Sequence, residues 1–446
     1  MENNKHKNKS RNIATTHAII GGFTITILLG AILLMMPFAS RSGNSTDFLT
    51  CLFTSTSAMC VTGLVVVDTA THWSFFGQLI ILILIQLGGM GIILVASMIT
   101  IISGQKINLS HRATLQEALA VDKVGGIIRL TKFILNAFVI FEILGALLLF
   151  TSFINEFDLP NAIWNSIFHS ISAFCNAGFD IMGFKGHYSS LTHYTHNIMI
   201  NITIMLLIVT GGIGFTVWDD IFHKKFKFSK YALQSKVVII TTIVLILLPA
   251  IYFFNFEYTS LGISNRILPS LFQSITTRTA GFNTTNFSDM SEVGKAIAII
   301  LMFIGGSPCS TAGGIKTTTI AILLISCIAM YRRQNEPHIF YRKIKIQTIK
   351  NAITIFVSYL VVFITVGCII CKIENITLLE SIFETSSAIG TVGLSLGHTP
   401  FLSNISRMLI IFLMFFGRIG GLTFIYAIIP SLNDSSRYIS EDIQVG

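Results

Sequence analysis

Charged residues are scarce in this chain. Of 446 residues, 30 are Lys or Arg and 21 are Asp or Glu, together 11% of the sequence, whereas hydrophobic residues make up 52%. The mean hydropathy of +0.74 excludes an ordinary soluble fold and is typical of a polytopic membrane protein. The net charge of +9 does not indicate nucleic-acid binding, because the basic residues fall in short connections and have no motif for base reading.

Motifs of catalysis and metal binding are also missing. The chain has no H-E-x-x-H, no G-x-S-x-G and no carboxylate pair, which argues against an enzyme. His193 and His196 have no third ligand beside them, so we assign both to the membrane interface. Gly313-Gly-Ile-Lys-Thr resembles a phosphate loop, but Ile315 separates the second glycine from Lys316, and this excludes nucleotide binding here.

Eight apolar runs are long enough to cross a bilayer, which takes about 20 residues. They cover residues 17–38, 75–102, 130–153, 196–218, 236–256, 294–330, 349–370 and 405–430. Shorter half-polar segments lie between them, and those at 47–59 and 378–389 have the length of re-entrant helices. The order is a span, a half-helix, a glycine turn and a second span, repeated four times.

Four short segments carry this repeat. Each is rich in Ser and Thr and ends in a small residue, a glycine and a bulky apolar residue; the glycines are Gly63, Gly178, Gly281 and Gly393, at intervals of a little over one hundred residues. A second glycine cluster follows each turn, at 88–91, 211–214, 313–314 and 417–421. Two features that recur in phase indicate an internal repeat, and such repeats in membrane chains surround a shared site.

Lys and Arg gather on one side of the predicted spans, in the N-terminus and in three connections. By the positive-inside rule this side is cytoplasmic, and both termini lie on it. The four glycine turns therefore face the outside of the cell membrane. The predicted organisation is a tail at 1–16, repeats at 17–102, 130–218, 236–330 and 349–430, cytoplasmic loops at 103–129, 219–235 and 331–348, and a tail at 431–446.

The glycine turns have the chemistry of an ion pore. A ring of inward-pointing backbone carbonyls replaces the water around a cation, and glycine reaches backbone conformations that other residues avoid. The half-helices would aim their negative C-terminal ends at the ion. Small residues also let helices pack closely, which explains one copy but not four in phase. We therefore predict an all-α polytopic membrane protein with four span, half-helix, span repeats around one pore.

These turns, together with Ile304-Gly-Gly-Ser-Pro-Cys-Ser-Thr-Ala-Gly-Gly-Ile-Lys-Thr-Thr318, resemble the potassium-transport superfamily that includes TrkH, KtrB and the plant HKT transporters. The resemblance covers nearly the whole chain and is greatest to the KtrB branch. It implies potassium as the substrate, a pseudo-fourfold protomer with one pore, and a homodimer. It also implies a cytoplasmic octameric ring of KtrA-type RCK subunits that binds ATP or ADP. No cofactor is implied on this chain, and sodium as an activator stays open.

The resemblance places the selectivity filter on the four turns. The filter residues are Val61, Thr62, Gly63, Asn176, Ala177, Gly178, Thr279, Ala280, Gly281, Thr391, Val392 and Gly393. Glycine in all four turns goes with potassium preference in this superfamily, whereas sodium-preferring plant members carry Ser in the first. We therefore expect potassium over sodium, and expect Gly63→Ser to weaken the preference.

The segment Gly305–Thr318 interrupts the sixth apolar run with glycines and a proline, and only the third repeat is interrupted so strongly. We predict an intramembrane gate loop below the filter; a packing kink is the alternative. The predicted gate residues are Gly305, Gly306, Ser307, Pro308, Cys309, Ser310, Thr311, Ala312, Gly313, Gly314, Lys316 and Arg418. Cys309 stands where the resemblance leads us to expect glycine.

Charged residues inside spans are functional candidates. The resemblance puts Arg418 against the gate loop, where its five donors would hold carbonyl oxygens. Lys316 either lines the pore or extends to the cytoplasmic side. We expect Arg278 to brace the filter from behind, Glu384 to anchor filter backbone and Glu142 to be a packed, hydrogen-bonded carboxyl.

The main hypothesis is a gated, potassium-conducting membrane subunit. An alternating-access carrier with inverted repeats is the first rival. It is disfavoured because each repeat has an even number of crossings, so all four share one orientation. A membrane enzyme is the second rival, disfavoured because no acid and base residues cluster at one depth.

Overall fold

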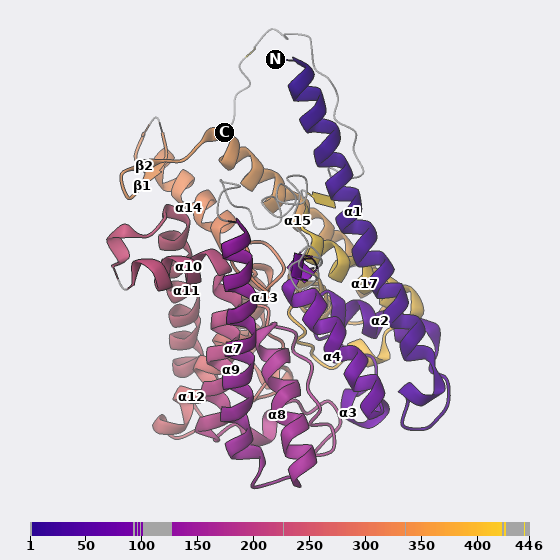
Figure 1. Cartoon of the computed structure of the whole chain (residues 1–446). Helices are drawn as coiled ribbons and strands as arrows, with labels where there is room; N and C mark the ends of the chain where they lie inside the picture. The colour runs from indigo at the N-terminus through magenta and orange to yellow at the C-terminus, as the bar shows by residue number, and fades with distance from the viewer. Residues whose placement is uncertain are drawn as a thin grey trace.

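The computed structural model of the chain is almost entirely helical, and its long helices run roughly parallel (Figure 1). It describes residues 2–91, 94–95, 97–98, 100, 127–225, 227–334, 336–421, 423–424 and 441, and for residues 2–16 and 18 the helix alone. Most of the predicted loop at 103–129, the end of the last apolar run and nearly all of the tail at 431–446 lie outside the described residues.

Each repeat consists of a first helix, a half-helix and a second helix. The first helices are α1 (Glu2–Met35), α7 (Ile127–Phe153), α11 (Leu233–Tyr252) and α15 (Ile346–Glu374). The half-helices are α2 (Phe48–Met59), α8 (Leu159–Phe174), α12 (Ile263–Thr276) and α16 (Leu378–Gly390), and the second helices are α4 (Phe75–Met90), α9 (Ile198–Ile213), α13 (Glu292–Phe303) and α17 (Asn404–Ile419). The connections hold α3 (Thr69–His72), α10 (Phe215–Lys224), α14 (Thr317–Tyr331), and the hairpin of β1 (His338–Ile339) and β2 (Arg342–Lys343).

Hydroxyl groups fasten each half-helix to the first helix of its own repeat. The Oγ atoms of Ser55, Ser170 and Ser274 donate to carbonyl oxygens of α1, α7 and α11 at 2.7, 2.7 and 2.6 Å. In the fourth repeat Ser381 donates to the carbonyl of Gly367 at 2.6 Å. The Ser and Thr content of the half-helices thus has a structural use, because a hydroxyl lets two helices approach closely while its polar group stays bonded.

The four repeats follow one another in a closed ring. The second helix of each repeat packs on the half-helix of the next one: α4 on α8, α9 on α12, α13 on α16, and α17 on α2. The last contact joins the end of the chain to its beginning. The C-terminal ends of the four half-helices, and the turns that follow them, therefore meet around one axis.

All four second helices end at the same relative position. α4, α9 and α17 stop before Gly91, Gly214 and Gly420, whose φ angles are +79°, +103° and +93°, and α13 stops before the segment 304–316. The third repeat has the longest interruption, as we predicted, but our prediction that the other three second spans are continuous is wrong. Apolar side chains continue past each glycine, so hydropathy does not reveal a break that depends on a left-handed φ.

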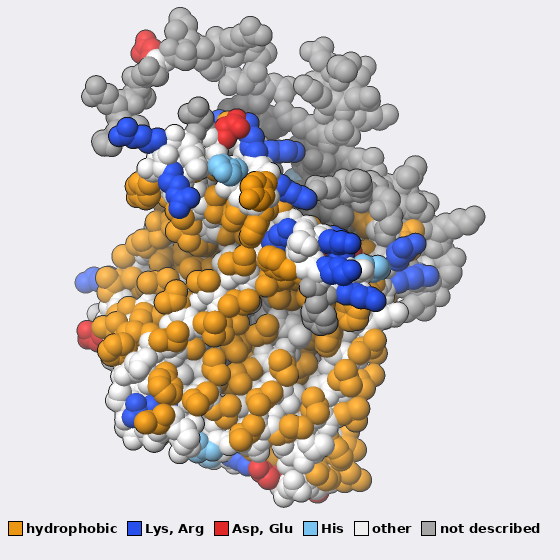
Figure 2. Space-filling model, turned by 90° about the vertical axis from the view of Figure 1, so that its left-hand side faces the viewer, with side chains coloured by type: hydrophobic (Ala, Val, Ile, Leu, Met, Phe, Trp, Pro, Cys, Tyr) orange, Lys and Arg blue, Asp and Glu red, His pale blue; other side chains and the backbone are white. Residues whose placement is uncertain are grey.

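Three single helices in the described part of the chain are long and apolar enough to cross a membrane: α7, α11 and α15. The pair α9 and α10, bent by 96°, counts as a fourth if it is one span. A broad band of apolar side chains covers the face shown in Figure 2, and Lys and Arg gather along one edge of this band. Such a large exposed apolar surface fits lipid as its solvent.

Candidate functional site

The four glycine turns share one backbone conformation. Their first residues are in the left-handed region although none is glycine: φ is +56° at Val61, +59° at Asn176, +69° at Thr279 and +51° at Thr391. The glycines two residues later have φ of +92°, +68°, +80° and +94°, and the residues between them are not left-handed. Left-handed non-glycine residues are uncommon and costly, so four at equivalent places indicate a conformation required at this site.

The four glycines form the closest part of the ring. A Cβ atom added to Gly63 would overlap the carbonyl oxygen of Ala177, and one added to Gly178 would lie 2.6 Å from that of Ala280. In the same way Gly281 faces the carbonyl of Val392, and Gly393 faces that of Thr62. Each glycine is therefore required by its neighbour, and any larger residue would push the next turn away.

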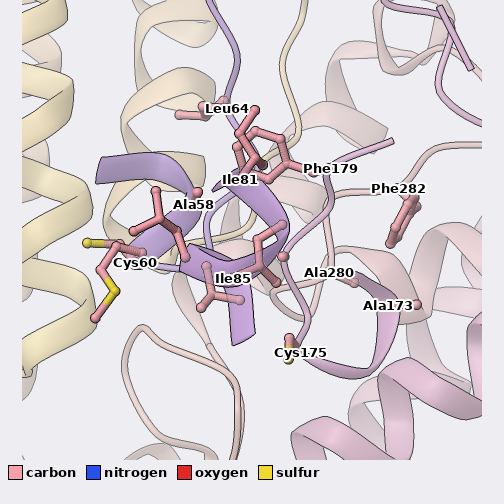
Figure 3. Packing of buried hydrophobic residues seen from close by; sticks show 14 of the residues in the cluster. Ala58, Cys60, Leu64, Ile81, Ile85, Ala173, Cys175, Phe179, Ala280 and Phe282 are labelled. Atoms are coloured by element: carbon pink, nitrogen blue, oxygen red, sulfur yellow. The ribbon is translucent and has the colours of Figure 1, made fainter. Parts of the chain in front are cut away.

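Hydroxyls of the half-helices hold these turns from behind. Ser57 and Ser387 accept from the N–H groups of Gly63 and Gly393, both at 3.1 Å. In the second and third repeats Ser172 and Thr276 donate to the carbonyls of the residues after the glycine, Phe179 (2.7 Å) and Phe282. Those bulky residues are buried in the hydrophobic core, part of which Figure 3 shows, with Phe179 near Ile81 and Leu64. The turns are fixed by polar bonds and by the core together.

A cavity of about 200 Å³ opens above the ring and is lined by all four turn glycines. Asp68, Asp180 and Tyr188 also line it. Burial raises the pKa of Asp180 to about 7, and the nearby Asp68 adds to this, while the N–H of Met182 acts in the opposite direction. The cavity gives four turns a common entrance with carboxyl groups beside it.

A polar residue near the middle of three half-helices braces the loop after each turn. Glu384 accepts from the N–H of Leu396 at 2.9 Å and from the hydroxyls of Ser395 and Thr399 at 2.7 and 2.6 Å. His169 accepts from the N–H of Ile181 at 3.4 Å. Gln273 donates to the carbonyl of Thr285 at 3.0 Å. We had singled out Glu384 alone. Glu384 and His169 lie nine residues before their turn glycines and Gln273 lies eight before Gly281, so an alignment of the repeats with a gap of one residue would have found them.

The segment 304–316 lies directly beneath the ring. A Cβ added to Gly313 would overlap the Thr391 hydroxyl, and Thr311 donates through Oγ1 to the carbonyl of Phe174, the last residue of α8, at 3.2 Å. The segment is also bonded through its backbone, since Gly314 donates to the carbonyl of Gly417 at 3.2 Å. Cys309 has a φ of +54°, the left-handed conformation that explains why glycine was expected there.

Arg418 joins this segment to the wall of the ring. Its guanidinium donates to the carbonyls of Thr311 and of Gly88 in α4. One side chain of the fourth repeat thus connects the third repeat with the first. Lys316 turns back onto its own segment, where its Nζ donates to the carbonyl of Ala312 at 2.8 Å.

Other singled-out residues lie outside this arrangement. Glu142 accepts from Gln86 Nε2 at 3.1 Å, but its other oxygen is buried without a partner, so the predicted satisfied carboxyl is only half right. Arg278 is buried, yet its Nε has no hydrogen-bond partner. His193 and His196 are exposed, and no group of three potential metal ligands occurs among the described residues.

We expected no C-x-x-C pair among the cysteines, and this was wrong, because Cys368 and Cys371 have that spacing. Both lie in α15, and Cys371 donates through Sγ to the carbonyl of Ile376 at 3.2 Å. All seven cysteines fall in the described part of the chain, and none forms a disulfide.

The family model TrkH, described as a cation transport protein, matches residues 2–437. The chain belongs to this family. Its members are ion transport proteins, so the chain is a membrane transport protein and not an enzyme.

Relatives in the family are similar over almost their entire length. The potassium/sodium uptake protein NtpJ of Enterococcus hirae is 39% identical, covering 99% of both chains. The Ktr system potassium uptake protein B of Bacillus subtilis is 38% identical over 95% of both chains. Among solved structures, the potassium transporter TrkH of Vibrio parahaemolyticus matches with a TM-score of 0.71 at 19% identity, over 92% of this chain and 85% of that one. The last similarity supports the fold.

Proposed function

We propose that this chain is the potassium-translocating subunit of a Ktr-type uptake system in the cell membrane, with both termini in the cytoplasm. The observation that carries the proposal is the closed ring of Gly63, Gly178, Gly281 and Gly393, each preceded by a residue in the left-handed conformation. Where left-handed residues alternate with others along an extended segment, successive carbonyls point to the same side of it. A ring of such carbonyls replaces the hydration shell of a potassium ion. The names of relatives from Enterococcus hirae and Bacillus subtilis, both potassium uptake proteins, agree with this substrate.

The segment 304–316 serves as the gate in this proposal. It lies under Thr391 of the fourth turn and Phe174 at the end of α8, and Arg418 holds it there. A potassium ion that leaves the ring therefore meets this segment first. Backbone without helical hydrogen bonds is tolerated at membrane depth only where it contacts protein or water. In this proposal the segment contacts protein on one side and the pore on the other. Opening requires that the segment move aside, which breaks the bonds of Arg418.

The proposal extends to partners of stated kinds. We propose a homodimer with one pore in each protomer, controlled by a cytoplasmic ring of RCK subunits that bind ATP or ADP. The name of the Bacillus subtilis relative, protein B of a Ktr system, is that of one component of a larger system. Sodium as an activator fits the potassium/sodium name of the relative from Enterococcus hirae.

Ion flux into vesicles tests the proposed function. The purified protein is reconstituted in lipid vesicles, and uptake is measured under separate potassium and sodium gradients. We expect potassium uptake that follows its electrochemical gradient and exceeds sodium uptake at equal concentration. Strictly coupled transport that saturates at carrier rates would support the alternating-access rival instead, and equal uptake of both ions would remove the filter assignment.

A further inference from the structure

The helix α10 leaves the bundle at a sharp angle. It turns by 96° from α9 at Gly214, and the indole N–H of Trp218 holds the bend by donating to the carbonyl of Thr210 at 3.0 Å. Because α9 runs with the other helices of the bundle, a helix at this angle to it lies along the membrane surface rather than through it.

The bend is bonded directly to the gate segment. On the α9 side, Ser307 and Thr311 donate through their backbone N–H groups to the carbonyls of Gly212 (3.1 Å) and Gly211 (3.2 Å). On the α10 side, Phe215 donates its N–H to the carbonyl of Cys309 at 2.6 Å. The gate segment therefore has three backbone bonds to this one corner, and a shift of α10 changes the last of them first.

The acidic residues of α10 are already engaged. Asp220 accepts from Ser235 Oγ at 2.6 Å and from the N–H of Ala232 at 2.8 Å, both at the start of α11, and also pairs with Lys224. Asp219 pairs with His223 at 3.1 Å. The two carboxylates thus have their nearest partners within α10 and at the start of α11, not among the lysines that follow α10.

The outer surface of α10 combines exposed aromatic and basic side chains. Phe222 is 62% exposed and its ring lies 5.3 Å from that of Phe133 in α7. Exposed cations lie on the same segments: Arg129 and Lys132 beside Phe133 in α7, and Lys225, Lys227 and Lys230 after α10. Among the described residues no carboxylate pairs with any of the last three lysines. Figure 2 shows a group of Lys and Arg next to the apolar band.

We propose that this surface is a binding site for anionic phospholipid, which holds α10 in the membrane plane and thereby keeps the gate segment docked under the filter. A phosphate headgroup matches three lysines at the edge of the apolar band, and Phe222 reaches the acyl region beside it. The proposal rests on the proposed function, because it needs a gate for α10 to hold.

Potassium flux in two kinds of vesicle tests the site. The protein is reconstituted in phosphatidylcholine alone or mixed with phosphatidylglycerol, and we expect severalfold slower uptake with the anionic lipid. The variant Lys225→Gln, Lys227→Gln, Lys230→Gln is expected to lose this slowing, because each lysine near an anionic surface contributes about fivefold to lipid binding. The control variant Lys345→Gln, Lys350→Gln, Lys372→Gln removes three other exposed cations, at the start of α15 and within it, and is expected to behave as the wild type.

Two substitutions at one position test the connection to the gate. Phe215→Pro removes the N–H that bonds to Cys309, at the first position of a helix, where proline is tolerated. Phe215→Leu keeps the N–H and most of the apolar bulk. We expect the proline variant to bind photoreactive phosphatidylglycerol normally while its flux no longer responds to the lipid, and the leucine variant to respond.

The outcomes separate the two proposals. No potassium uptake in either kind of vesicle would contradict the proposed function. Uptake that is present but equal in both, or faster with phosphatidylglycerol, would overturn the lipid site alone. Slowing that requires an added cytoplasmic protein and not the lipid would assign these lysines to a protein partner instead.

Discussion

The two halves of the ring, above and below the glycines, follow different rules. Above, all four repeats contribute the same backbone conformation, the same glycine and a buried apolar residue after it. Below, the repeats differ: α4, α9 and α17 end at a single glycine, whereas α13 is followed by a segment of thirteen residues, 304–316. A filter needs its carbonyl oxygens at equal distances from one ion, which favours symmetry. A gate needs one part that moves while the others stay, and this requires that the symmetry be broken.

Arg418 is the clearest case of broken symmetry. The glycine clusters of the first and second repeats read Gly88-Gly-Met-Gly91 and Gly211-Gly-Ile-Gly214, and the fourth reads Gly417-Arg-Ile-Gly420. Arg418 therefore occupies the position of Gly89 and Gly212. Those glycines leave no side chain below the ring, while Arg418 fills the space and bonds to the gate segment. Under the proposed function, this comparison predicts that selectivity is distributed over four repeats and gating is concentrated in two.

The largest expected effect comes from breaking the symmetric half. Gly63→Ser places a Cβ against the carbonyl of Ala177 at a φ of +92°. Strain of about 1–3 kcal/mol is expected from such a conformation, so potassium over sodium discrimination falls about tenfold or more, measured as the ratio of fluxes in vesicles. The control Gly397→Ser has a similar φ, +98°, with nothing within 4 Å of the added atom. Unchanged discrimination in Gly63→Ser would show that the turns are not the filter.

The next effect comes from the asymmetric half. Arg418→Gln removes the charged fork that holds Thr311 and Gly88. A hydrogen bond to a charged group contributes about 1.5–3 kcal/mol, so we expect the resting potassium flux to rise about tenfold with its selectivity unchanged. Arg407→Gln is the matched control on the same helix, since Arg407 bonds to Pro400 and not to the gate segment. A loss of selectivity without faster flux would contradict the division between the two halves.

A thiol in the gate segment gives a smaller, local signal. Cys309 is partly buried and left-handed. In a protein whose other six cysteines are replaced, we expect a cytoplasmic thiol reagent to modify Cys309 faster in the Arg418→Gln background than with Arg418 present. Mass spectrometry of the modified protein measures the rate. Equal rates in the two backgrounds would argue that the segment does not move.

The smallest effect concerns the entrance above the ring. Because the pKa of Asp180 is raised to about 7, its carboxyl is charged at pH 8 and becomes neutral as the pH falls below about 7. Loss of this charge lowers the local potassium concentration, so uptake at low potassium is expected to decrease by less than about threefold on acidification. Asp180→Asn should remove the pH dependence and leave selectivity intact. A variant that keeps the full pH dependence would exclude Asp180 as its source.

The symmetric half of the molecule was predictable from the sequence because its signals are local. Each turn needs a glycine and a hydroxyl-rich half-helix within a dozen residues, and the predicted half-helices at 47–59 and 378–389 agree closely with α2 and α16. The fourfold repetition made these signals stand out from the close-packing alternative.

The asymmetric half was harder to predict because its contacts join distant repeats. The bond of Arg418 to Gly88 spans 330 residues, and our expectation for it came from family resemblance. The breaks at Gly91 and Gly420 lie in apolar runs whose hydropathy continues past the glycine, and Gly214 lies near the end of its run. The turn of Lys316 onto its own segment depends on the path of the backbone there, which composition does not determine.

Flux through Gly63→Ser and Arg418→Gln, measured side by side in the same vesicles with potassium and sodium gradients, tests the central claim most directly. The account predicts that the first variant lowers the potassium to sodium ratio without a higher resting rate, and that the second raises the resting rate at an unchanged ratio. If both variants changed the ratio and the rate together, filter and gate would be one structure, and the division between four repeats and two would be wrong.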